Sequence, residues 1–274
     1  MTRRKFLLSS AAVGLPTLGY AGLLEPKMLT IKEITLGIQN LPTGFEGFKI
    51  AQLTDFHYRP DLEQDLIKEA VAKAMDWEPD LIALTGDFVD RKPDALHDLV
   101  PELAPLRAPF GVYGVLGNHD YYQSSELYNR EAFRKIQTQL LVNDIAYPQQ
   151  GEQMVEVIGL DSIYSSTPNF HLPVGSQPEE RLRLVLSHEP DTFDQVTARY
   201  APHLQLSGHT HGGQCRIPFV GYAPFTPPYG RQYIDGAYEN GSSSLYVSSG
   251  LGTSLARLRF ACRPEIVLLT LTSA

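Results

Sequence analysis

Five short polar clusters each follow an apolar run in this 274-residue chain, and they constrain its fold more than any other feature. In chain order the clusters are Asp55-Phe56-His57, Gly86-Asp87, Gly117-Asn118-His119-Asp120, Ser187-His188-Glu189 and Gly208-His209-Thr210-His211. A short apolar run that ends in turn residues is typical of a buried strand. Because open α/β sheets bind ligands beyond the carboxyl ends of their strands, we expect the five clusters to meet at one edge.

The side chains of these clusters are of the kinds that hold divalent metal ions. A two-metal site needs several protein ligands, some of them anionic, and an open side for substrate. The candidate ligands are Asp55, His57, Asp87, Asn118, His188, His209 and His211. Such a mixture of imidazole and carboxylate suits Mn²⁺, Fe, Zn²⁺ or Co²⁺ better than Mg²⁺. The three histidines outside the clusters are predicted to be surface or capping residues: His97, His171 and His203.

The order D-x-H, G-D-x-x-D, G-N-H-D, S-H-E-P, G-H-T-H-G-G-Q resembles the pattern of the calcineurin-like metallophosphoesterase superfamily. The Gly212-Gly213-Gln214 extension and the tail Gly250-Leu251-Gly252-Thr253-Ser254 are similar to its bacterial exported or membrane-linked phosphodiesterase branch. The resemblance covers residues 30–272 and leaves no ligand position unfilled. It implies a four-layer α/β/β/α sandwich of two mixed sheets, with a dimetal site at the C-terminal ends of the strands.

The resemblance also implies a role for each residue of the site. One metal would be held by Asp55, His57 and His211, the other by Asn118, His188 and His209, with Asp87 as the bridge. Metal coordination lowers the pKa of bound water to about 7, so a hydroxide between the metals would be the nucleophile. His119 would stabilise or protonate the leaving oxygen, and Asp120 would orient His119 or cap a helix. We interpret Asp90 as a residue that holds a ligand or its loop in place.

The rest of the chain predicts alternating strands and helices, which indicates layered α/β packing. Strands are predicted over residues 31–38, 48–53, 81–84, 112–116, 154–160, 182–186, 204–206, 245–248 and 265–271. Helices are predicted over residues 62–76, 96–104, 124–143 and 191–200. Residues 217–238 are too rich in proline for regular structure and are expected to form a wall or lid of the cleft. A second group comprises Tyr121, Tyr122, Tyr128 and Arg130, whose side chains could either contact substrate or simply pack within the fold.

Composition and the N-terminus limit the partners and the compartment. The net charge of −8 and pI near 5.5 argue against a dedicated nucleic-acid binder. Two distant cysteines, Cys215 and Cys262, do not make a disulfide framework and are predicted to be small buried residues. Arg3-Arg4 ahead of an apolar stretch predicts a twin-arginine export segment or an N-terminal anchor over residues 1–24. The stretch is diluted by polar residues, which makes it a weak candidate for a permanent transmembrane helix. We therefore expect a protein of the periplasm or cell envelope, with peripheral membrane association left open.

These features favour a metal-dependent phosphodiesterase that acts on a small-molecule or lipid-linked phosphoester. Arg216 and Arg231 are the only cations near the clusters, so few positive charges would be available to balance the second negative charge of a monoester. The alternatives are a pyrophosphatase of the UDP-2,3-diacylglucosamine type and a non-catalytic metal-binding scaffold. A protein phosphatase is disfavoured because the chain shows no separate docking extension.

Overall fold

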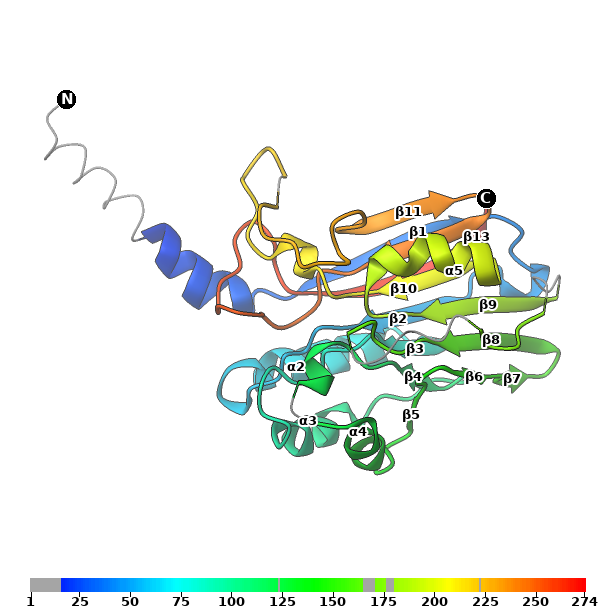
Figure 1. Cartoon of the computed structure of the whole chain (residues 1–274), viewed down its shortest axis with the longest axis horizontal. Helices are drawn as coiled ribbons and strands as arrows, with labels where there is room; N and C mark the ends of the chain where they lie inside the picture. Colours follow the sequence, from blue (N-terminus) through cyan, green and yellow to red (C-terminus); the bar gives the residue numbers. More distant parts are fainter. Residues whose placement is uncertain (1–15, 123, 165–170, 176–179, 222) are drawn as a thin grey trace, which may run out of the picture.

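The computed structural model describes residues 16–122, 124–164, 171–175, 180–221 and 223–274. Its strands form two mixed sheets, and in Figure 1 the strand order of each sheet runs from the top of the view to the bottom. The first sheet has the order β1-β13-β2-β3-β4-β5, and the second has the order β11-β12-β10-β9-β8-β6, with β7 paired to β8. The predicted sandwich of two mixed sheets is confirmed.

The first sheet consists of β1 (Thr30–Ile38), β13 (Glu265–Ser273), β2 (Lys49–Leu53), β3 (Leu81–Leu84), β4 (Val112–Gly114) and β5 (Thr138–Leu140). From β2 to β5 its neighbours are parallel, whereas β13 runs antiparallel to β2. Every residue of β3 is buried, as expected for a parallel strand covered on both faces.

The second sheet consists of β11 (Gly236–Asn240), β12 (Ser243–Val247), β10 (Leu204–Ser207), β9 (Arg181–Leu186), β8 (Gln153–Gly159), β7 (Gln149–Gln150) and β6 (Asp144–Ala146). Strands β12, β10, β9 and β8 are mutually parallel, while β11, β6 and β7 pair antiparallel at the margins. The two sheets thus each carry a central parallel block.

Three apolar clusters hold the layers together. Leucines and isoleucines from both sheets, among them Ile50, Leu81, Leu184 and Leu204, fill the space between the sheets. The outer face of the first sheet packs against helices α2 (Pro60–Asp76) and α3 (Ala95–Leu103). The outer face of the second sheet packs against α5 (Phe193–Tyr200). This gives the order helix, sheet, sheet, helix.

The predicted helix over residues 124–143 is wrong beyond Phe133. Helix α4 spans Glu126–Phe133, and the following residues form β5, which pairs parallel to β4 at the edge of the first sheet. Thr138 and Leu140 are buried and Gln139 is exposed, which is the alternation of a strand with one covered face. The strand β11 was not predicted either, because its first residues fall within the proline-rich range 217–238 that was expected to be irregular.

The prediction that His203 is a surface or capping residue is wrong as well. Its side chain is buried, and its Nδ1 accepts a hydrogen bond of 2.9 Å from the backbone N–H of Arg183. His97 and His171 are exposed, as predicted.

The N-terminal prediction falls mostly outside the described residues, since Arg3 and Arg4 lie within residues 1–15. Residues 16–24 are helical and lead into β1. Across the part of the chain that the structure describes, no helix has the length and apolar character needed to cross a membrane.

Candidate metal centre

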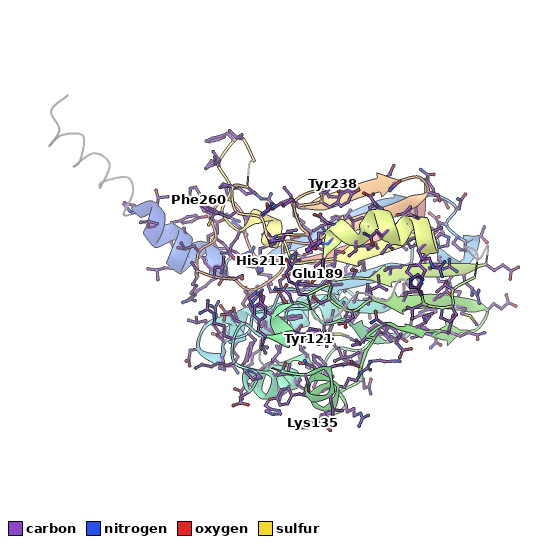
Figure 2. The ribbon with its side chains drawn as sticks, viewed as in Figure 1. Tyr121, Lys135, Glu189, His211, Tyr238 and Phe260 are labelled. Carbon is purple, nitrogen blue, oxygen red and sulfur yellow. The ribbon has the colours of Figure 1, made fainter. Side chains whose placement is uncertain are left out.

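The loops that carry the seven predicted ligands all leave the carboxyl ends of neighbouring parallel strands. Asp55 and His57 follow β2, Asp87 follows β3 and Asn118 follows β4 in the first sheet. His188 follows β9, and the two histidines at 209 and 211 follow β10, in the second sheet. Figure 2 labels His211 and Glu189 at these strand ends. All seven side chains are buried.

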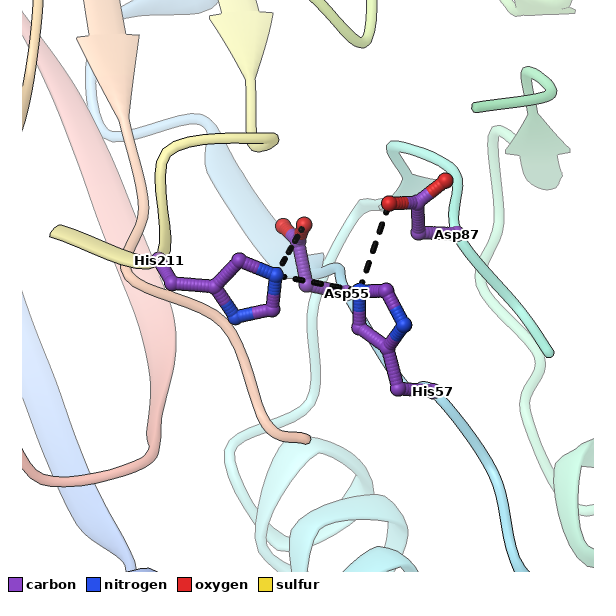
Figure 3. Close-up of side chains that lie close together, drawn as sticks. All are labelled: Asp55, His57, Asp87 and His211. Atoms are coloured by element: carbon purple, nitrogen blue, oxygen red, sulfur yellow. Dashed lines mark hydrogen bonds and ion pairs between the residues drawn. The ribbon is translucent and has the colours of Figure 1, made fainter. Parts of the chain in front are cut away.

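Four of these side chains converge on one point (Figure 3). The Nε2 atoms of His57 and His211 lie 3.0 Å apart. His211 Nε2 lies 3.4 Å from Asp55 Oδ1, and His57 Nε2 lies 3.3 Å from Asp87 Oδ2. Two imidazole nitrogens facing each other between carboxylates are a donor set that suits a divalent transition metal.

A second group shares Asp87 with the first. His188 Nε2 lies 3.2 Å from Asp87 Oδ2, and His209 Nδ1 lies 3.0 Å from Asn118 Oδ1. The structure therefore brings together the two ligand sets that the resemblance implied, with Asp87 common to both.

The hydrogen bonds of the His188 and His209 rings indicate that this group can bind a metal ion. His188 Nδ1 lies 2.6 Å from the carbonyl oxygen of Thr85, and His209 Nε2 lies 2.8 Å from that of Pro228. Those nitrogens donate to the carbonyl groups, so in the neutral imidazole the other nitrogen of each ring carries the lone pair that can bind a metal. Both lone pairs face oxygen atoms, an arrangement that is favourable when a cation lies between them.

The side chains of the two groups change one another's pKa. Burial alone would raise the pKa of Asp87, but the charge and hydrogen bonds of His188 and His57 lower it well below its usual range. Burial alone would lower the pKa of His57, but the neighbouring carboxylates of Asp87 and Asp90 raise it to about 9. Burial lowers the pKa of His209 to about 3. Asp87 is thus an anion that stabilises positive charge on either side of it.

The backbone is strained at most of these positions. Five of the seven ligands have a positive φ, which side chains other than glycine rarely adopt: Asp55, His57, Asp87, His209 and His211. Such strain persists only where the surroundings impose it, and it clusters at functional sites. A Cβ at Gly117 would overlap Asp87 Oδ1, and one at Gly208 would overlap Asp55 Oδ2, so both positions require glycine.

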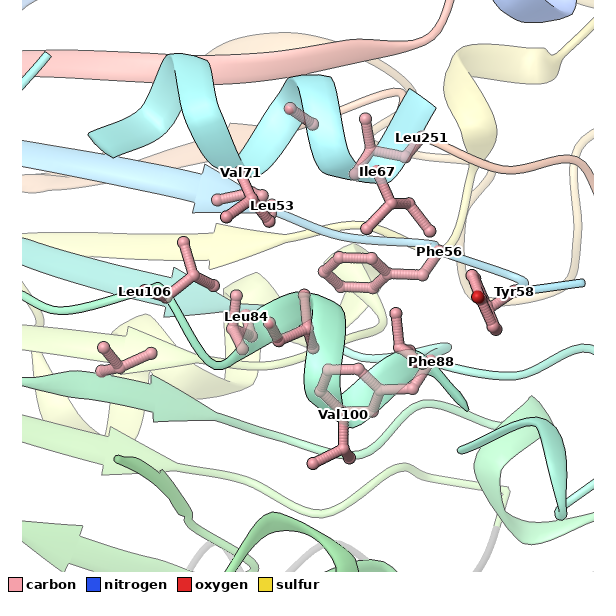
Figure 4. Packing of buried hydrophobic residues seen from close by; sticks show 14 of the residues in the cluster. Leu53, Phe56, Tyr58, Ile67, Val71, Leu84, Phe88, Val100, Leu106 and Leu251 are labelled. Atoms are coloured by element: carbon pink, nitrogen blue, oxygen red, sulfur yellow. The ribbon is translucent and has the colours of Figure 1, made fainter. Parts of the chain in front are cut away.

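Aromatic residues between the ligands fix these loops to the core (Figure 4). Phe56 stands between two ligands and stacks on Phe88, with ring centroids 5.4 Å apart. Phe88 in turn packs on Phe133 of α4 at 4.6 Å. Phe56 and Phe88 are fully buried among residues of the first sheet, α2 and α3. These two aromatic anchors were not predicted, although an apolar residue inside a polar cluster, such as Phe56, is a visible signal in the sequence.

His119 lies at the edge of the site and is held by Asp90, not by Asp120. Its Nδ1 is 3.0 Å from the carbonyl oxygen and 3.4 Å from the carboxylate of Asp90. The carboxylate of Asp120 instead accepts hydrogen bonds from the backbone N–H groups of Phe88, at 2.8 Å, and Gly117, at 2.9 Å. The prediction that Asp120 orients His119 is therefore wrong: Asp120 ties two ligand loops together, because its short side chain is buried between them.

A cleft of about 510 Å³ opens over Asp87, Asn118 and His209. The predicted wall is present, since Pro224, Phe225, Thr226, Pro227 and Pro228 line the cleft together with Tyr122, Tyr164, Ser254 and Leu255. None of the described lining residues is lysine or arginine. Arg216 binds Asp235 at 3.0 Å instead.

Of the aromatic group after Asn118, Tyr122 alone lines this cleft. Tyr121 donates to Asp161, Tyr128 contacts His97, and Arg130 pairs with Glu126. Both cysteines are free thiols; Cys262 is buried and Cys215 half-buried, and neither belongs to a described group of metal-ligand atoms.

Comparison with known proteins agrees with this geometry. Residues 48–213, which include all seven predicted ligands, match the family model of calcineurin-like phosphoesterases. The chain is 35% identical to the metallophosphoesterase YkuE of Bacillus subtilis, covering 100% of this chain and 98% of YkuE. It is 31% identical to phosphodiesterase YaeI of Escherichia coli, with 99% of each covered. It is 25% identical to UDP-2,3-diacylglucosamine pyrophosphatase LpxG of Chlamydia trachomatis, with 91% of each covered.

Proposed function

The chain belongs to the calcineurin-like phosphoesterase family, and we propose that it is a phosphodiesterase that works with two divalent metal ions. The observation that carries this proposal is Asp87, whose carboxylate belongs to both groups of ligand atoms. A bridging carboxylate holds two cations close together while it offsets their repulsion.

Two cations bound there would supply Lewis-acid stabilisation of the phosphoryl group and an activated water. The chain's own residues supply the rest. With Asn118 as a neutral ligand, the site keeps a net positive charge that attracts a phosphate. His119 is held at Nδ1 by the Asp90 carbonyl, and its Nε2 lies 3.5 Å from Ser254 Oγ at the cleft. From there it would donate a proton to the leaving oxygen, which contributes about 10²–10⁴-fold to the rate.

The cleft favours a diester over a monoester. A monoester carries a second negative charge, and the described lining offers no lysine or arginine to meet it. The apolar side chains of Phe225 and Leu255 instead suit an aryl or acyl group on the second ester oxygen.

The test is metal analysis of the purified protein together with kcat/KM for bis(p-nitrophenyl) phosphate and p-nitrophenyl phosphate under the same Mn²⁺. We expect two metal ions per chain and a higher kcat/KM for the diester. A monoester preferred tenfold, about 1.4 kcal/mol in transition-state terms, contradicts the diester assignment. A well-loaded protein that hydrolyses neither ester would favour the non-catalytic scaffold.

The second candidate is a pyrophosphatase of lipid-linked sugar nucleotides. It is supported by the apolar cleft and by the likeness to LpxG. The two candidates separate on UDP-2,3-diacylglucosamine: release of UMP at a kcat/KM above that of the aryl diester would favour the pyrophosphatase.

We also propose that the chain is exported by the twin-arginine route, which is supported by Arg3-Arg4 ahead of an apolar stretch. Replacing both arginines with lysine should leave the protein in the cytoplasm. Secretion of that variant at the normal level, measured by cell fractionation, would rule the route out. A tag-matched parent chain serves as the control.

A further inference from the structure

Large apolar side chains stand exposed on two loops, each of which also supplies residues that line the metal cleft. Phe219 is fully exposed, Leu255 is 88% exposed, Phe225 is 76% exposed and Val220 is 73% exposed. They belong to two loops, residues 217–225 and 254–258, and we call these four residues the apolar rim. Phe225 and Leu255 also line the cleft itself. Exposed apolar side chains gathered at one place mark an interaction site.

The helical segment at residues 16–24 adds to this end of the molecule. Its Ala21 is buried, and the Ala21 carbonyl accepts a 2.9 Å hydrogen bond from Arg259 N, directly after the second rim loop. Its Tyr20 ring contacts the Phe260 ring edge to face, with centroids 6.5 Å apart. The segment also exposes Leu18, Leu23 and Leu24. In Figure 1 this helix and both rim loops lie at the left end of the view, and Figure 2 labels Phe260 there.

The two segments around the rim loops are basic, unlike the acidic chain as a whole, although Arg216 pairs with Asp235 outside them. Residues 214–231 and 251–263 contain five arginines and no aspartate or glutamate, although the chain has a net charge of −8. Arg231 and Arg263 are exposed, whereas Arg259 is buried and donates to backbone carbonyls. Arginines beside protruding apolar side chains match an anionic lipid surface, which attracts the cations and admits the apolar groups at the headgroup boundary.

We propose that the apolar rim and its arginines dock the protein on an anionic lipid bilayer. A bilayer fits better than a folded partner because the rim residues lie on two separate loops and are each at least 73% exposed. Such side chains enter a soft interface without a matching pocket on the other side. Docked in this way, the metal cleft opens toward the headgroup plane, where lipid-linked phosphoesters carry their phosphate. This inference concerns the surface and stands whether or not the proposed diester hydrolysis is correct.

The test is co-sedimentation of the full chain with phosphatidylcholine vesicles, with and without phosphatidylglycerol. We expect stronger binding to the vesicles that contain phosphatidylglycerol. The variant Phe219→Ser/Val220→Ser should bind these vesicles roughly tenfold or more weakly, because two fully presented apolar side chains are lost. Neither residue lines the cleft or is buried, so the Tm of the variant should match that of the parent, which shows that the variant is folded. The variant Arg231→Gln/Arg263→Gln should lose the preference for phosphatidylglycerol.

Matched controls come from α4 and the residues after it, at the bottom of Figure 2 where Lys135 is labelled. Leu127 is 62% exposed, so Leu127→Ser removes a comparable apolar side chain, and Arg134→Gln/Lys135→Gln removes two exposed cations. Both controls should bind vesicles like the parent. The proposal is overturned if the rim variant binds as well as the parent, if the controls weaken binding equally, or if the rim variant instead dissociates a dimer without changing vesicle binding.

Discussion

Replacing Gly117 with alanine tests whether the close approach of two ligand loops builds the metal centre. Gly117 precedes Asn118 on the loop after β4, and its Cα faces the loop that carries Asp87. A Cβ there would overlap Asp87 Oδ1 and lie 2.6 Å from Asp87 N and 2.8 Å from His188 Nε2. Contacts under 3.0 Å essentially never occur for real Cβ atoms. Because one of the clashing atoms belongs to the backbone, a change of rotamer cannot relieve the overlap.

The size of the effect follows from this overlap. Overpacking of a tightly packed region costs about 1–3 kcal/mol, which corresponds to a Tm lower by about 2–10 °C for a chain of this size. The larger effect should be on catalysis, since a displacement of about 1 Å at a reacting centre can lower the rate about 100-fold. We expect Gly117→Ala to lower kcat by about 10- to 100-fold and to weaken the binding of metal at the site of His188.

The assay combines thermal unfolding, metal content and kcat on an aryl diester. Gly44→Ala is a suitable control, because a Cβ at Gly44 meets Gln153 at an ordinary 3.6 Å, far from the site. If Gly117→Ala keeps its metal content and a kcat within twofold of the parent while Gly44→Ala does the same, the loop geometry does not control the site as argued.

Three further predictions concern the site and the core. In the parent, Asp87 accepts a hydrogen bond of 2.9 Å from His119 N, and Asp87→Asn keeps that acceptor oxygen but removes the negative charge. The variant should bind fewer than two metal ions, and its kcat/KM should fall by at least about 10³-fold. His119→Ala should lower kcat by about 10²–10⁴-fold at unchanged metal content; loss of a metal would show that His119 is a ligand. Burial lowers the pKa of His203 to about 4, below the 6.5 of an unfolded histidine. As the pH falls from about 6.5 to about 4, the unfolded chain therefore binds a proton first, and the free energy of unfolding should drop by up to about 3 kcal/mol. His203→Asn, which retains an acceptor near Nδ1, should remove this dependence in denaturant titrations at each pH.

The central strands and the ligand positions could be predicted because they depend on local sequence. A run such as residues 81–84, apolar at every position, can only be a fully buried segment, and the polar cluster after it must lie at an end of that strand. The seven candidate metal ligands could be identified in the sequence for the same reason. Each ligand lies within a few residues of its strand, so the chain has little freedom to carry it elsewhere.

Features that depend on contacts across the fold could not be predicted in this way. The three residues of β5 are too few to show a period, and they become a strand because β4 offers them an open edge. Asp120 and Asp90 carry the same carboxylate side chain, so the sequence does not distinguish their roles. Only the packed structure shows that Asp120 bridges the backbone N–H groups of two loops while Asp90 reaches the ring of His119.

The apolar wall and the metal centre are mechanically connected through one carbonyl group. Pro228 lies in the proline-rich wall, and its oxygen accepts from His209 Nε2 at 2.8 Å and from the hydroxyl of Tyr164 at 3.0 Å. The first hydrogen bond fixes the tautomer of a metal ligand, and the second fixes a side chain that lines the cleft. A substrate group that shifts the wall would therefore also tilt the ring of His209. Under the proposed function, the cleft wall and the predicted metal ligand His209 would respond to one another, because the wall supplies the backbone acceptor for the His209 ring.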